Sequence, residues 1–119
     1  MTVLVAHLPT RESTAALHAG AEEARRREED LVVFDLGDGT GRAAGESLVR
    51  ESGVRVVVEQ RDPRQPDAAG ALLDAATRHD ASVIVIGVRH RSPTGKLLFG
   101  SLAQQILLDA TMPVLAVKP

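Results

Sequence analysis

Apolar residues along this chain occur in short, nearly continuous runs, and longer amphipathic stretches separate the runs. Four of the runs are rich in β-branched residues: Val3–Ala6, Leu31–Leu36, Val83–Ile86 and Val114–Val117. Val54–Val58 is a fifth candidate. Apolar and polar positions do not alternate within them, which is typical of strands that are buried on both faces. The pattern therefore predicts five strands of a parallel sheet that is covered by helices on both sides.

The stretches between these runs have helical patterns. Arg11–Glu29 is rich in Ala and pairs Glu with Arg one turn apart, at 22 and 26 and at 23 and 27, which favours a solvated helix. Between Pro66 and His79, apolar residues repeat at i, i+3, i+4 and i+7 and form one stripe. A short helix around Ala43–Ser52 and a helix over Ser101–Ala110 complete the predicted order.

Strands that alternate with helices predict the α/β class, with a doubly wound, five-stranded parallel sheet. The 119 residues contain no internal repeat and suit one compact domain, so we predict a single domain over 1–119. The only aromatic residues are Phe34 and Phe99, so Val, Leu, Ile and Ala must build the core.

Composition excludes several classes of function. The formal net charge is -2, whereas non-specific DNA binding needs a basic face. The chain has no Cys, which removes disulfides, thiol catalysis and thiolate metal sites, and its His residues do not cluster at ligand spacing. No apolar run approaches the roughly 20 residues that cross a bilayer, and the N-terminus lacks a basic start and a cleavage site. We therefore predict a cytoplasmic protein with no nucleic-acid, membrane or metal partner of its own.

The segment from Gly87 to Ser101 carries the clearest chemical signal. A buried strand ends at Gly87, a polar loop with Arg89, His90, Arg91 and Lys96 follows, and Gly100-Ser101 opens a helix. Ligands of open α/β sheets bind at the carboxyl ends of strands, and the first amides of a helix are unpaired. Gly87 would allow a sharp turn, and Gly100 would let a phosphate approach the amides that follow.

The same residues also fit a purely structural interpretation. Ser101-Leu-Ala-Gln104 has the spacing of a capping box, in which the Ser side chain caps the helix and Gln104 reaches back. A second Gly-rich stretch, Gly37–Gly45, has a spacing one residue too long for a dinucleotide fingerprint, so we interpret it as a turn before a helix. His7 ends the first strand and either faces the site or is structural.

The spacing of Gly, two residues, Gly, nine residues and Gly-Ser resembles the signature of the universal stress protein family. Gly87, Gly100 and Ser101 match it, whereas His90 stands at the second glycine. The opening Val-Leu-Val-Ala and the closing Met-Pro-Val-Leu-Ala-Val-Lys are also similar, so the resemblance covers essentially the whole chain. It implies strand order 3-2-1-4-5, an adenine-nucleotide α-hydrolase-like fold, and a homodimer in which Val114–Val117 meets the same strand of a partner.

Many members of that family bind ATP, so the resemblance also implies a site for ATP with Mg²⁺. Adenine and ribose would lie near the ends of the first two strands and beside the residue before Gly87, and the phosphates on the loop. The implied residues are Ala6, His7, Leu8, Leu36, Ile86, Gly87, His90, Gly100, Ser101, Leu102 and Ala103. Two of them depart from the family: Leu8 replaces an Asp that holds the ribose or adenine, and His90 puts a side chain where the phosphates pass.

Three functions follow from these observations. The first is a dimeric stress-response module that binds ATP at the Gly87–Ser101 loop. The second, which Leu8 and His90 favour, is a dimeric interaction protein whose loop is structural and whose protein partners are unknown. The third is a slow ATP hydrolase, for which no acidic residue is obviously placed to hold Mg²⁺ and no catalytic base is apparent, so we predict no catalytic residue.

Overall fold

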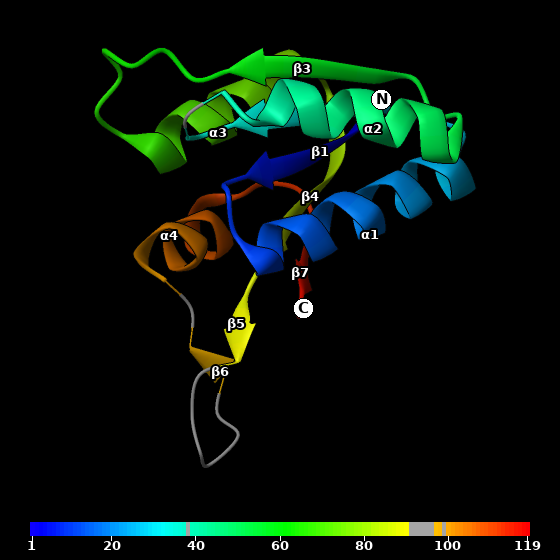
Figure 1. Cartoon of the computed structure of the whole chain (residues 1–119). Coiled ribbons are helices and arrows are strands. Elements are labelled where there is room, and N and C mark those ends of the chain that lie inside the picture. The colour runs from blue at the N-terminus through cyan, green and yellow to red at the C-terminus, as the bar shows by residue number, and fades with distance from the viewer. Residues whose placement is uncertain (38, 91–96, 99) are drawn as a thin grey trace.

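Strands and helices alternate along the chain in the computed structural model (Figure 1), which describes residues 1–37, 39–90, 97–98 and 100–119. The elements are β1 (Thr2–His7), α1 (Arg11–Arg27), β2 (Asp30–Asp35), α2 (Gly41–Ser52), β3 (Val56–Gln60), α3 (Ala68–Arg78), β4 (Ala81–Gly87), β5 (Arg89–His90), β6 (Leu97–Leu98), α4 (Ser101–Asp109) and β7 (Val114–Val117).

Five of the strands form one parallel sheet in the order β3-β2-β1-β4-β7. This is the predicted order 3-2-1-4-5, which is confirmed. The chain first winds outward from β1 through β2 to β3, and then crosses to β4 on the other side of β1. The carboxyl ends of β1 and β4 therefore mark the switch point, where ligands of doubly wound sheets bind.

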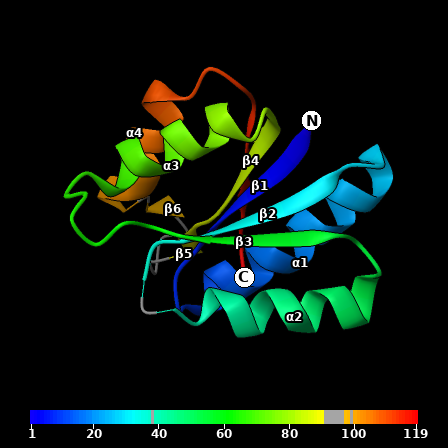
Figure 2. The same cartoon turned by 90° about the horizontal axis from the view of Figure 1, so that it is seen from above.

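Helices cover both faces of the sheet, as the continuous apolar runs predict (Figure 2). One core cluster joins α1 and α2 to side chains such as Val3 and Val5 of β1. The other joins α3 and α4 to Leu4 and Ala6 of the same strand. Successive side chains of a strand point to opposite faces. Odd positions of β1 therefore face α1 and α2, and even positions face α3 and α4.

Most element boundaries differ from the prediction by one or two residues. Strand β3 begins at Val56 and not at Val54, and Leu36 lies just beyond the end of β2. Both i, i+4 ion pairs were predicted on α1. Arg27 does contact Glu23, but the described ion pair of Glu22 is with Arg25, three residues on.

The segment after Gly87, predicted as a loop, contains a short antiparallel pairing of β5 with β6. Arg91 and Lys96, which the sequence suggests as basic residues of this loop, lie outside the described residues. None of the helices in the described part of the chain has the length and apolar character needed to cross a bilayer.

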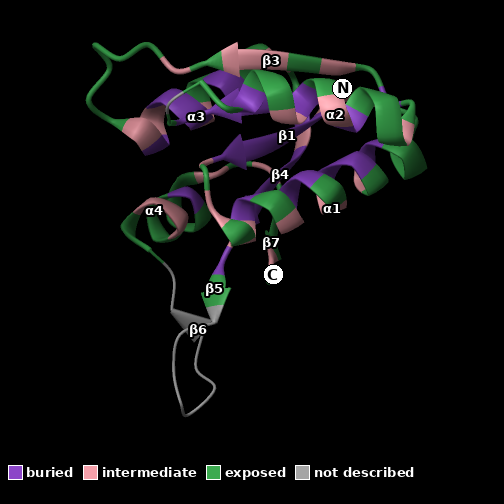
Figure 3. Ribbon diagram, viewed as in Figure 1, coloured by how far each residue is buried: buried purple, intermediate pink, exposed green. Residues whose placement is uncertain are grey.

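The two edge strands are less buried than the central ones (Figure 3). Val57 of β3 is 38% exposed and Leu115 of β7 is 37% exposed, whereas Leu4 of β1 is fully buried.

Candidate functional site

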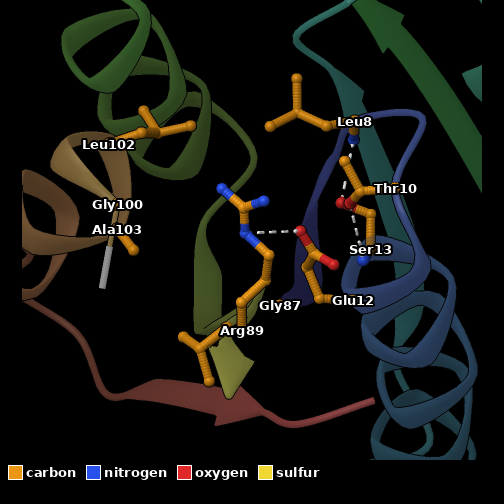
Figure 4. A pocket seen from close by; sticks show the side chains of 10 residues that line it. Leu8, Thr10, Glu12, Ser13, Gly87, Arg89, Gly100, Leu102 and Ala103 are labelled. Atoms are coloured by element: carbon orange, nitrogen blue, oxygen red, sulfur yellow. Dashed lines mark hydrogen bonds and ion pairs between the residues drawn. The ribbon is translucent and has the colours of Figure 1, made fainter. Parts of the chain in front are cut away.

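A pocket of about 190 Å³ opens at the switch point, between the first turns of α1 and α4 (Figure 4). It is lined by Leu8, Thr10, Glu12, Ser13, Gly87, Val88, Arg89, Gly100, Leu102 and Ala103. A smaller recess of about 40 Å³ adjoins it and extends to three apolar side chains below, Ala6, Ile86 and Ile106. The α1 residues form one wall, the α4 residues form the opposite wall, and Arg89 reaches up between them.

Most of the residues predicted from the sequence come together at this pocket and its recess. They are Ala6, Leu8, Ile86, Gly87, Gly100, Leu102 and Ala103. They belong to separate elements that meet because β1 and β4 are neighbours in the sheet and α4 packs beside β4 on one face.

His7 lies apart from this group. It occupies an odd position of β1, so its side chain, like those of Val3 and Val5, points to the face covered by α1 and α2. It is 5% exposed, and its Nε2 lies 2.9 Å from Thr40 Oγ1. It lines a different pocket, together with Leu17 of α1 and Leu48 of α2.

The other predicted residues also lie outside the lining of the pocket. Leu36 is buried in the core on the α3 and α4 side. Ser101 is exposed at the start of α4. The backbone of His90 pairs with Leu97, and its side chain lies outside the described part of the chain.

The two signature glycines have different roles. Gly87 does not have a positive φ, so a sharp turn does not explain it. A Cβ on Gly87 would lie 2.2 Å from the carbonyl oxygen of Glu12, so the glycine permits β4 to approach the backbone of α1. A Cβ on Gly100 would meet no described atom within 4 Å. Gly100 therefore borders open space, whereas Gly87 is required for packing.

Three of the four helix N-termini receive an oxygen from the chain itself. In α1, Thr10 Oγ1 accepts a hydrogen bond from the amide of Ser13, and in α3 Asp67 Oδ1 accepts one from Gly70. The N-terminus of α2 is served by Asp35, which is fully buried at the end of β2. Asp35 Oδ2 accepts from the amide of Gly41 at 2.9 Å.

Helix α4 differs, because no described side chain caps it. Its N-cap is Gly100, so the predicted capping box at Ser101-Leu-Ala-Gln104 is wrong: Ser101 already lies inside the helix. The first amides of any helix have no carbonyl partner within the helix. Those of Ser101, Leu102 and Ala103 are therefore the groups in this fold best suited to receive an external anion.

The described residues 37, 39 and 40 of the Gly-rich stretch form the turn predicted before α2, whereas residues 41–45 belong to the helix itself. Sequence reasoning missed the residue that organises the turn, which is Asp35. Its Oδ1 also accepts from the amide of Gly37 at 2.8 Å, so both carboxylate oxygens bind the turn. The available signal was an acidic residue within the otherwise apolar run Leu31–Leu36.

Sequence reasoning also missed the two charged residues of the pocket as a pair. Glu12 and Arg89 are the only charged side chains among the described residues that line it. The Glu12 side chain is 15% exposed, and its Oε1 lies 3.5 Å from Nε of Arg89, whose side chain is 56% exposed. Within the described part of the chain, no group of three His, Cys, Asp or Glu residues could hold a metal ion by itself.

The wall formed by Leu8 is apolar on one side and hydrogen-bonded on the other. The amide of Leu8 donates to Ser13 Oγ at 3.1 Å, while the Leu8 side chain packs against the core. The pocket thus has an apolar inner part, a charged pair near its mouth and a helix N-terminus along one wall.

Comparison with known proteins identifies relatives over most of the chain. A model of the universal stress protein family matches residues 35–118. A universal stress protein of Mycolicibacterium smegmatis is 42% identical, with 88% of each chain covered.

Solved structures agree with this result. A universal stress protein from Archaeoglobus fulgidus is 32% identical with a TM-score of 0.82, and the match covers 99% of this chain and 98% of that one. A second structure, of the universal stress protein from Archaeoglobus fulgidus in complex with dAMP, is 26% identical with a TM-score of 0.75 and the same coverage.

Proposed function

Since this chain belongs to the universal stress protein family, we propose that it is a nucleotide-binding module that holds an adenine nucleotide between α1 and α4. The observation that carries the proposal is the N-terminus of α4, which has no described side-chain cap and opens onto a pocket at the switch point. The dAMP complex of a structural relative supports the same class of ligand.

The phosphate is assigned to the first turn of α4. Amides at a helix N-terminus point outward and carry a partial positive charge, so they bind phosphate oxygens. Gly100 leaves room for this approach, because no described atom lies within 4 Å of the place that a Cβ would take there. Arg89 supplies a guanidinium at the same mouth, and a guanidinium forms strong, charge-assisted hydrogen bonds with phosphate.

The base is assigned to the apolar recess beneath the phosphate. The side chains of Ala6, Leu8, Ile86 and Ile106 offer dispersion and burial but no hydrogen bond. Ser13, whose Oγ accepts from the amide of Leu8, also lines the recess. An aromatic ring would therefore extend from the recess into the adjoining pocket and be held mainly by apolar contact. An adenine held in this way would be distinguished only weakly from other bases.

ATP with Mg²⁺ is the form that the family resemblance favours, and the pocket offers one residue that fits the metal. Mg²⁺ is usually held by one or two carboxylates together with substrate phosphates. Glu12 supplies one carboxylate in the pocket, so Glu12 and the phosphates would share the ion. Bound in this way, the ion would neutralise phosphate charge. We assign no catalytic residue.

We also propose a homodimer through the free edge of β7. Among the described strands, β7 pairs only with β4, and an open apolar edge strand favours pairing with another chain. Leu115 of β7 is 37% exposed, and on the preceding helix Leu107 is 40% and Leu108 is 72% exposed.

Sedimentation velocity tests this interface: Leu115→Glu should give a monomer, whereas Val57→Glu on the opposite edge strand should leave the dimer intact. A dimer that survives Leu115→Glu would place the interface elsewhere.

A thermal melt tests nucleotide binding most directly. The protein has no Trp or Tyr, so far-UV circular dichroism reports the transition. Nucleotide-free protein should melt at a higher temperature with AMP or MgATP, because ligand at 100 times its dissociation constant stabilises by about 2.7 kcal/mol. Gly100→Ala should keep the melting temperature of the free protein and lose most of the shift.

The absence of any shift at millimolar nucleotide would support the other candidate, a nucleotide-independent dimeric interaction protein. The apolar side chain of Leu8 favours that alternative, because it removes a hydrogen bond to the ribose or adenine. In that case the dimer surface and the exposed helix faces become the sites to study.

A further inference from the structure

The phosphate end of the pocket contains a carboxylate, which is unusual for an anion site. Glu12 projects from the first turn of α1 into the space that faces α4 (Figure 4). Its side chain is 15% exposed, so surrounding protein atoms cover most of it and reduce the contact with water that would screen its charge. A phosphate that enters this pocket therefore meets an attractive helix N-terminus on one wall and a negative charge on the other.

The position of Glu12 is set by the packing of α1 on β4. The backbone of Glu12 lies so close to Gly87 that a Cβ on the glycine would lie 2.2 Å from the Glu12 carbonyl oxygen. The hydrogen bond from Ser13 to Thr10 Oγ1 holds the same helical turn. The Glu12 side chain can change its rotamer, but its backbone cannot withdraw from the pocket without moving the sheet.

In the free protein, Arg89 balances this charge. The pair leaves the described lining of the pocket electrically neutral, and its single contact of 3.5 Å is longer than an ideal charge-assisted hydrogen bond. Arg89 is 56% exposed, so its guanidinium can turn from Glu12 to a phosphate at the mouth. That movement pairs the guanidinium with the first phosphate and leaves the negative charge of Glu12 without its partner.

A second and a third phosphate have no such counter-charge among the described residues. Two unit charges about 7 Å apart, at the effective dielectric constant of about 20 found near protein surfaces, repel strongly enough to change an affinity about 10- to 50-fold. A divalent cation between Glu12 and the phosphates removes this repulsion.

We propose that Glu12 makes the binding of a nucleoside triphosphate depend on a divalent cation, while a nucleoside monophosphate binds without one. The proposal rests on the nucleotide site proposed above, and it assigns to Glu12 the choice between metal-free and metal-bound ligands. Arg89 acts as the exchangeable partner of both the carboxylate and the first phosphate.

Isothermal titration of nucleotide-free protein tests the proposal with four ligand conditions: AMP and ATP, each in EDTA and each in excess Mg²⁺. For the wild type, Mg²⁺ should tighten ATP binding at least about tenfold and change AMP binding less than about twofold. In Glu12→Gln, metal-free ATP should gain about tenfold relative to AMP, and most of the Mg²⁺ dependence should disappear.

The matched control is Glu22→Gln, which makes the same charge change on the same helix. Glu22 lies ten residues further along α1, about 15 Å at 1.5 Å per residue, which exceeds the Debye length of about 8 Å at physiological salt. This control should bind all four ligands like the wild type. A circular dichroism melt of each variant confirms that it folds.

The outcomes separate the inference from the function on which it rests. If AMP and ATP bind but Glu12→Gln changes both affinities by the same factor, or changes neither, then Glu12 does not select the ligand and the inference is wrong. If neither the wild type nor Glu12→Gln binds any nucleotide, the proposed function is wrong and the inference falls with it. Arg89→Gln provides a further test, because it should weaken AMP binding in EDTA and in Mg²⁺ alike.

Discussion

Two helices that begin at the carboxyl edge of the sheet, α2 and α4, differ in whether a side chain accepts hydrogen bonds at the N-terminus. At α2, the fully buried carboxylate of Asp35 accepts hydrogen bonds from the amides of Gly37 and Gly41. At α4, no described side chain caps the helix, and a pocket lies in front of it. The same requirement, an oxygen for unpaired amides, is met by the chain in one place and left to a ligand in the other.

The contrast extends to the ion pairs on the two sides of the sheet. On the β3 side, the Glu59 carboxylate accepts hydrogen bonds from Nη1 and Nη2 of Arg78 at 3.2 and 2.6 Å. Nε2 of His79 lies 2.7 Å from Oε1 of the same carboxylate. On the β4 side, Glu12 has a single described contact of 3.5 Å with Arg89. A carboxylate with several close partners serves the fold, whereas one with a single distant partner is free to respond to a ligand.

The largest effect on stability is expected from Gly87→Ala, which tests whether the two signature glycines differ as the structure indicates. The added Cβ collides with backbone atoms of Glu12, which cannot rotate away, so unfolding should become easier by about 3 kcal/mol. Gly100→Ala should change stability by less than about 0.5 kcal/mol. Urea denaturation followed by circular dichroism measures both, and equal losses would contradict the assignment.

A somewhat smaller loss is expected from Asp35→Ala, which removes the internal anion of α2. Two amides lose their acceptor, and one of these hydrogen bonds is buried, so the free energy of unfolding should fall by about 2 to 3 kcal/mol. Asp35→Asn keeps one oxygen of similar shape and should lose less. If Asp35→Ala is as stable as the wild type, the turn before α2 does not depend on this carboxylate.

Removal of the side-chain caps of α1 and α3 should lower the free energy of unfolding moderately, whereas the corresponding change in α4 should have little effect. Thr10→Ala and Asp67→Ala each remove a cap and should cost about 1 kcal/mol. Ser101→Ala should cost less than about 0.5 kcal/mol, because Ser101 does not cap α4. A loss of about 1 kcal/mol for Ser101→Ala would restore the capping box and weaken the case for a phosphate site.

The smallest effect expected is on the pH dependence of stability, and it tests the ion-pair cluster of Glu59, Arg78 and His79. The side-chain hydrogen bonds from the guanidinium of Arg78 lower the pKa of Glu59 below its ordinary value, with a further contribution from His79. The unfolded chain then binds the proton more readily, so the stability from this cluster is present above the ordinary glutamate pKa of about 4.3 and is lost as the pH falls below it. The melting temperature of the wild type should therefore fall more between pH 6 and pH 3 than that of Glu59→Gln. Parallel curves would show that the cluster adds nothing to stability.

The fold was predictable from the sequence to a large extent. Five apolar runs and the helical patterns between them predict the strands and helices, and the match of Gly87, Gly100 and Ser101 to a family signature predicts the strand order. Most of the expected site residues also meet at one pocket. They do so because residues at the carboxyl ends of neighbouring parallel strands share one edge of the sheet.

Particular side chains limited the prediction of the site. His7 is adjacent in sequence to Ala6 and Leu8, yet strand alternation sends it to the opposite face. Glu12 was missed because no local pattern distinguishes it from any acidic residue in the first turn of a helix. The short β5–β6 pairing was missed because a pairing of two residues per strand leaves no periodicity to detect.

The sequence by itself determined the type, order and apolar faces of the elements, since these follow from periodicities over a few neighbouring residues. Only the tertiary structure decided that Gly87 serves the approach of α1, that Asp35 closes one helix end, and that Glu12 faces Arg89 across a pocket. Each of these depends on the distance between segments far apart in the chain. That distance is set by the way the helices pack on the sheet.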